Sequence, residues 1–110
     1  MQKKNKLMKL TSELIGYCYD IGMKDINVNI KQENDKDIIT IQGEVLNLSD
    51  NQVKNIRRLL NTPREGFVEE YYWELIGESG GELSLAGMLI DEAMVSYENN
   101  YLQIILYRKE

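Results

Sequence analysis

The sequence of 110 residues contains no histidine, a single cysteine, a single proline and no long run of basic or apolar residues. Without histidine there can be no histidine-dependent catalytic triad, imidazole metal site or histidine phosphoacceptor. The lone Cys18 cannot form an internal disulfide, which agrees with a reducing compartment. Because Lys9, Thr11 and Glu13 interrupt the apolar residues near the start, we expect no signal peptide and no membrane span. These absences predict a cytoplasmic protein without a membrane partner.

The net charge and the chain length limit the possible partners and the number of domains. The net charge is −5, and the only basic runs are short ones such as Lys3-Lys4 and Arg57-Arg58, so a nucleic-acid partner is not expected. There is no repeat or low-complexity segment, and a single proline gives a linker no obvious place. We therefore expect one domain over residues 1–110.

The first half of the chain predicts a helix followed by a hairpin. A helical stripe ends at Gly22, which is expected to adopt a left-handed cap. A strand with alternating apolar residues follows, and the polar residues Glu33 to Asp37 are expected to form the turn into a second strand. The apolar positions are Leu7, Leu10, Leu14, Tyr17, Cys18 and Ile21 in the helix, Ile26, Val28 and Ile30 in the first strand, and Ile38, Ile39 and Ile41 in the second.

The second half predicts helices and then another hairpin. Ser49 and Gln52 form a capping-box pattern, and a second helix start lies at Thr62-Pro63. A third helical stripe is expected from Leu85 to Ala93. Asn99-Asn100 tolerates the positive φ angles of a two-residue turn between two strands. Pairing the two hairpins gives an α+β two-layer sandwich, in which helices cover one face of a mainly antiparallel sheet.

The run from Glu13 to Val28 resembles the first ATP-site helix and following strand of the histidine-kinase-like ATPase superfamily, which includes DNA gyrase and the histidine kinases. That family has a glutamate, three residues, an asparagine that helps hold magnesium, an alanine, and then a glycine before an alternating strand. Glu13 and Gly22 match this pattern. Tyr17 occupies the position of the asparagine, and Cys18 that of the alanine.

Two further motifs of the family are incomplete. Its Asp-x-Gly motif, in which the aspartate reads adenine, falls near Gly43, where the aspartate is missing. Its last glycine-rich box falls near Gly80-Gly81, but Glu82 and Ser84 replace two of its glycines, and a carboxylate there repels phosphate. The resemblance therefore implies an ATPase-like fold with a degenerate site made of Glu13, Tyr17, Gly43, Gly80 and Gly81, and it implies no cofactor, no metal and no ATP hydrolysis.

Several of these residues also have ordinary structural interpretations. Glu13 can be a solvated helix residue. Cys18 can be a reactive thiol, although a buried inert one is the preferred interpretation. Asp35 and Asp37 lack the glycine and the glutamate of a calcium loop, so a plain hairpin turn is preferred.

An acidic helix face is a candidate interaction surface. Glu70, Glu74 and Glu78 are four residues apart and stack like charges, either as a solvated face or opposite basic residues such as Arg57, Arg58 and Arg64. Trp73 lies about a third of a turn away from the stripe of Tyr71 and Tyr72, so an exposed indole suited to a partner or a second copy is expected.

Two functions remain open on this basis. The first is a non-catalytic interaction or regulatory module on a degenerate ATPase-like scaffold, with an unidentified protein partner or self-association, a dimer being preferred. The second is a small-molecule or nucleotide-binding domain, a kinase-like regulator, with an altered adenine site in which adenine stacks on Tyr17 or Tyr19.

Overall fold

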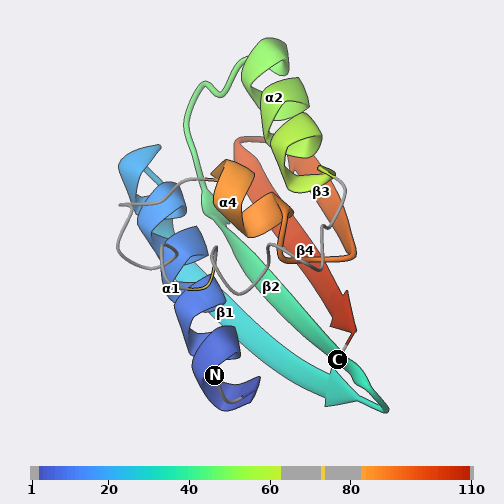
Figure 1. Cartoon of the computed structure of the whole chain (residues 1–110). Helices are drawn as coiled ribbons and strands as arrows, with labels where there is room; N and C mark the ends of the chain where they lie inside the picture. The colour runs from blue at the N-terminus through green and yellow to red at the C-terminus, as the bar shows by residue number, and fades with distance from the viewer. Residues whose placement is uncertain (1–2, 63–72, 74–82, 110) are drawn as a thin grey trace.

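The computed structural model describes residues 3–62, 73 and 83–109. Its elements follow in the predicted order of helix, hairpin, helices and hairpin (Figure 1). They are α1 (Lys3–Asp20), β1 (Lys24–Glu33), β2 (Lys36–Glu44), α2 (Asp50–Leu60), α4 (Leu83–Gly87), β3 (Glu92–Glu98) and β4 (Tyr101–Lys109). The helix predicted after Thr62 falls outside the described residues except for Trp73. Within the described part, no helix is both long and apolar enough to cross a lipid bilayer.

The four strands form one antiparallel sheet in the order β1-β2-β4-β3. The two hairpins meet where β2 pairs with β4, from Lys36 opposite Lys109 to Glu44 opposite Tyr101. Figure 1 shows α1, α2 and α4 on one side of this sheet. The predicted α+β two-layer sandwich is confirmed.

Local signals in the sequence account for most of the boundaries. Gly22 has the expected positive φ of 88° after α1, and Asn99 and Asn100 have φ angles of 52° and 62° in the β3–β4 turn. The capping box is present, since the amide of Gln52 donates to Oγ of Ser49 over 3.1 Å. In the first hairpin, the closing pair is Glu33 with Lys36. The turn is therefore shorter than predicted.

The core lies between the helices and the inner face of the sheet. Side chains of α1, α2 and α4 pack there against alternate residues of the central strands β2 and β4. The main contributors are Leu10, Leu14 and Cys18 of α1, Ile56 and Leu60 of α2, Leu83 and Ala86 of α4, Ile39 and Ile41 of β2, and Leu102, Ile104 and Leu106 of β4.

The third predicted helix is much shorter than the sequence suggested. It ends at Gly87, and Leu89 and Ile90 are buried in the connection that follows, while Ala93 already belongs to β3. The amide of Asp91 donates to the carbonyl of Tyr107, which starts the sheet pairing. The apolar residues from Leu85 to Ala93 fit the spacing of one helix, but over so few residues the same spacing also fits a short helix followed by a strand.

Candidate functional site

Glu13 and Tyr17 are one turn apart on α1, and both are at least partly buried. Glu13 is only 2% exposed and lies in a buried row with Leu10 and Leu14. Its interpretation as a solvated surface residue is therefore wrong. The sequence could not show this, because a glutamate at the border of an apolar helical stripe can be buried or exposed, and the exposed state is far more common.

Tyr17 and Cys18 occupy the positions where the family has asparagine and alanine. Tyr17 is partly buried and packs against the core. Burial raises the pKa of its phenol, and the neighbouring Cys18 contributes a smaller effect in the same direction. Cys18 is fully buried, as preferred from the sequence, and burial raises the pKa of its thiol to about 12. Neither group is a charged ligand for a cation near neutral pH.

Gly43 has a packing role in this structure. It lies inside β2, and a Cβ atom there would come within 2.6 Å of Cγ of Met23 and 2.7 Å of the Lys24 carbonyl oxygen. The glycine lets the chain after α1 approach the sheet closely. Gly80 and Gly81 lie outside the described residues, as do Glu70, Glu74 and Glu78 of the predicted interaction surface.

Trp73 is completely buried, so the prediction of an exposed indole is wrong. Two cations lie over its ring, with Nζ of Lys6 at 5.7 Å and Cζ of Arg108 at 4.9 Å from the ring centre. Nζ of Lys9 donates to its carbonyl oxygen over 3.2 Å. Cations that cover aromatic faces stabilise such a position. Trp73 thus connects α1 to β4 and is part of the core instead of a docking surface.

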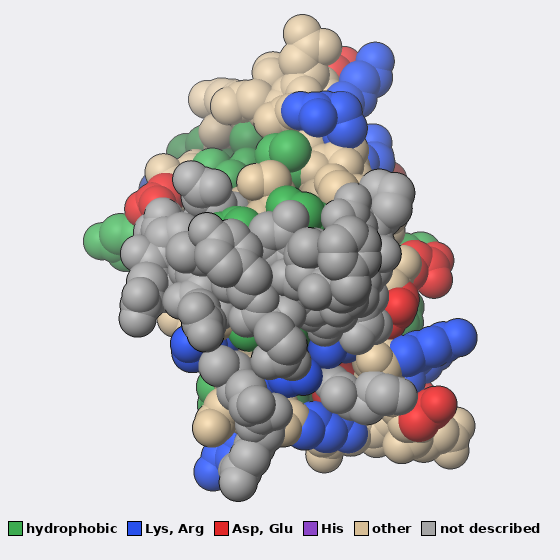
Figure 2. All heavy atoms as spheres, in the orientation of Figure 1, with side chains coloured by type: hydrophobic (Ala, Val, Ile, Leu, Met, Phe, Trp, Pro, Cys, Tyr) green, Lys and Arg blue, Asp and Glu red, His purple; other side chains and the backbone are tan. Residues whose placement is uncertain are grey.

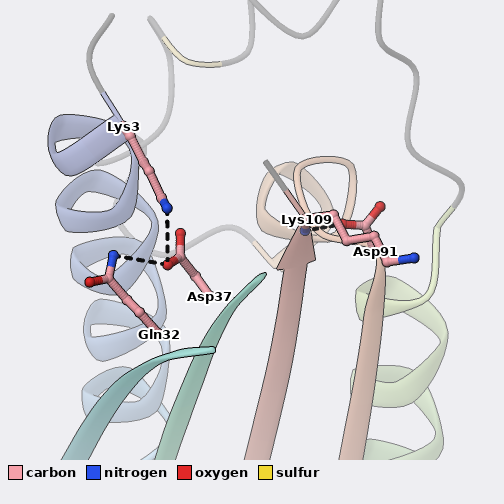
Figure 3. Close-up of polar contacts among 5 residues, drawn as sticks. All are labelled: Lys3, Gln32, Asp37, Asp91 and Lys109. Carbon is pink, nitrogen blue, oxygen red and sulfur yellow. Dashed lines mark hydrogen bonds and ion pairs between the residues drawn. The ribbon is translucent and has the colours of Figure 1, made fainter. Parts of the chain in front are cut away.

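A buried polar cluster near Trp73 was not predicted. Asp37 and Arg108 face one another across β2 and β4, and they are 1% and 3% exposed. Oδ1 of Asp37 accepts a hydrogen bond from Gln32 over 3.2 Å and lies 3.8 Å from Nζ of Lys3 (Figure 3). Arg108 donates to the carbonyl oxygen of Leu89. The alternation of the strand could have indicated that Asp37 is buried, since residues two apart in a strand point to the same face and Ile39 points into the core.

Lys and Arg side chains gather at the end of the molecule where α1 begins (Figures 1 and 2). A pocket of about 570 Å³ lies there between Lys3, Lys4, Leu7, Ile30 and Gln32. Two other pockets with described linings lie around Tyr107 and around Tyr101. None of these three pockets includes Glu13, Tyr17 or Gly43 in its described lining.

The described residues place Cys18 and Met23 in the core, with Tyr17 packed against it and Gly43 close to Met23. Among all the described residues, no group of three potential metal-ligating side chains is found. No protein-family model matches the chain, and no curated protein is significantly similar to it.

Proposed function

We propose that this chain is a non-catalytic interaction or regulatory module of the cytoplasm, built on a histidine-kinase-like ATPase scaffold that no longer holds ATP. The packing between α1 and the sheet is the observation that carries the proposal. Tyr17 and the fully buried Cys18 occupy the positions of the family's asparagine and alanine, four and five residues after Glu13. Met23 packs close to Gly43. A phosphate group bound there would meet the phenol of Tyr17 and would lack the magnesium ion that the family's asparagine helps to hold.

The buried state of Glu13 supports the same proposal. A catalytic carboxylate must reach the water that attacks the γ-phosphate. Glu13 is 2% exposed and lies beside Leu10 and Leu14 in the apolar row of α1. Water therefore has little access to its carboxylate.

The alternative function is binding of a nucleotide through stacking on Tyr17 or Tyr19. Tyr19 is 73% exposed whereas Tyr17 packs into the core, and two residues along a helix turn the side chain by about 200°. Tyr17 therefore offers little free ring surface to an adenine, and Tyr19 lies on the side of α1 away from the core. No contact of the described residues favours this alternative.

Thermal denaturation in the presence of ATP, ADP and magnesium tests the proposal. A nucleotide at one hundred times its dissociation constant would stabilise the fold by about 2.7 kcal/mol, whereas we expect no shift. A variant with Tyr17→Asn and Cys18→Ala restores two family positions and serves as the matched comparison. Hydrolysis of ATP by the purified protein that is lost in Glu13→Ala would refute the proposal, and a shift without hydrolysis would favour altered binding.

A further inference from the structure

The two edges of the sheet differ in how they are covered. Figure 1 shows α2 beside β3 at one margin, whereas β1 forms the other. On β3, Nε and Nη2 of Arg57 both donate to the carbonyl oxygen of Val95, over 3.3 and 3.0 Å. This arginine occupies a backbone acceptor that another strand would need. Strand β1 has ten residues, and all but Ile26 and Glu33 are exposed.

The outer edge of β1 presents backbone groups at alternate residues. Because Glu33 and Lys36 close a two-residue turn, the odd residues from Asn27 to Glu33 share their hydrogen bonds with β2. The amides and carbonyls of Val28, Ile30 and Gln32 consequently point away from the sheet. Val28 and Ile30 are opposite Ile41 and Ile39, so their side chains lie on the helix-covered face, yet they remain 39% and 37% exposed.

The sequence of this edge is nearly a palindrome. It reads Asp25-Ile26-Asn27-Val28-Asn29-Ile30-Lys31, which is symmetric about Val28 except for opposite charges at its two ends. In an antiparallel pair related by a two-fold axis through Val28, each residue opposes its mirror position in the other copy. Valine then meets valine, isoleucine meets isoleucine, asparagine meets asparagine, and aspartate meets lysine.

We propose that β1 pairs with β1 of a second copy of this chain, in the register centred on Val28, to form a continuous eight-stranded sheet. This register keeps the helices of both copies on the same side. It places the half-exposed Val28 and Ile30 against apolar residues of the other copy. A lysine on an edge strand usually discourages pairing, whereas here Lys31 is brought beside Asp25 of the second copy.

The bulge at the start of β1 defines the extent of the pairing. The register to β2 shifts between Lys24 and Asn27, and Asp25 has a φ of 50°. Regular pairing therefore extends from Ile26 to Ile30, and Asp25 contributes through its charge. An interface of this length is small, so a dissociation constant between about 10 µM and 1 mM is expected.

Sedimentation velocity between about 10 µM and 1 mM protein, at about 0.1 M salt, measures the dimer. Val28→Pro removes an amide that faces outward, so the fold is retained while the dimer weakens at least about tenfold. Asp25→Lys creates two like-charge pairs and weakens the dimer by about tenfold, and adding Lys31→Asp to it restores the affinity. Arg58→Ala, on α2 beside the opposite edge, leaves the affinity of the β1 pair unchanged, and circular dichroism confirms the fold of each variant.

An isotope-filtered nuclear Overhauser experiment on a mixture of labelled and unlabelled protein tests the register. We expect a contact between the Hα atoms of Asn27 and Asn29 from different copies, because these residues form the closely spaced non-hydrogen-bonded pair. A monomer at about 1 mM, an unchanged dimer in Val28→Pro, or failure of the charge swap to restore affinity would overturn the inference. The inference rests on the proposed interaction function, but the two can fail separately. If the protein stays monomeric and binds no nucleotide, the β1 dimer is refuted while the non-catalytic function stands.

Discussion

Replacing Gly87 by alanine tests how closely α4 packs against α2. The new Cβ would lie 2.0 Å from the carbonyl oxygen of Leu59, 3.1 Å from its carbonyl carbon and 3.2 Å from Cα of Leu60. Because these are backbone atoms, no side chain can rotate away. The contact to the oxygen must open by about 1.4 Å to reach 3.4 Å, where ordinary contact begins. The buried neighbours Ala86 and Leu60 would lose packing as the helices separate.

The direction of this effect separates packing from intrinsic preference. Alanine is the better helix former by about 1 kcal/mol, so propensity alone favours a more stable variant. Overpacking of a core costs about 1 to 3 kcal/mol, and a fixed backbone places Gly87→Ala at the upper end. We therefore expect a loss of about 3 kcal/mol and a melting temperature lower by about 10 to 20 °C.

Thermal and urea unfolding followed by circular dichroism measure the loss in Gly87→Ala. Gly22→Ala is the matched control, since Gly22 has a φ of 88° but nothing within 4 Å of its Cβ position. Its cost comes from the backbone alone and should be about 1 kcal/mol. The packing explanation would be refuted if Gly87→Ala were as stable as the unchanged protein, or more stable than Gly22→Ala.

Three further predictions concern Trp73, Cys18 and Arg57. Trp73→Ala should destabilise the fold by about 3 to 5 kcal/mol in urea unfolding, with Trp73→Phe between it and the unchanged protein; equal stability of all three would contradict the buried position. The thiol pKa of Cys18 is raised from 9.0 to about 12 in the folded state. The neutral thiol therefore contributes fully to the free energy of unfolding below pH 9, and this contribution decreases as the pH rises toward 12. At pH 10 the loss is about 1.4 kcal/mol, and it should be absent in Cys18→Ala when stability is measured against pH. Arg57→Ala should cost about 1 kcal/mol in thermal unfolding and promote salt-dependent aggregation in light scattering, because it exposes the edge carbonyl of Val95, whereas Arg58→Ala should do neither.

Much of the fold could be predicted because local chemistry and burial agree. The Ser49 capping box, the positive φ of Gly22 and the Asn99-Asn100 turn each have one dominant physical solution. The alternation of apolar and polar residues predicted the strands, because helices cover one face of the sheet and leave the other in water. The extent of α4 was not predictable in the same way, because its end depends on a close approach to a segment distant in sequence.

The site was harder to predict than the fold. The angular position of Trp73 on its helix predicts an exposed ring, yet Trp73 is buried in the core and contacts Lys6 and Arg108, which come from the two ends of the chain. Glu13 shows the same difficulty, since a single charged residue says little about the layer that packs over it. Both residues depend on tertiary contacts that no local pattern encodes.

The seam between β2 and β4 has a consequence for how the molecule is assembled. It joins strands from the two hairpins, which are far apart along the chain, so a large loop must close before the central pairing forms. Until then, the isoleucine-rich inner edge of β2 lacks its neighbour and offers a template to other unfolded chains. Refolding should therefore be slow and should lose yield at high concentration, and a chaperone that shields this strand would restore it.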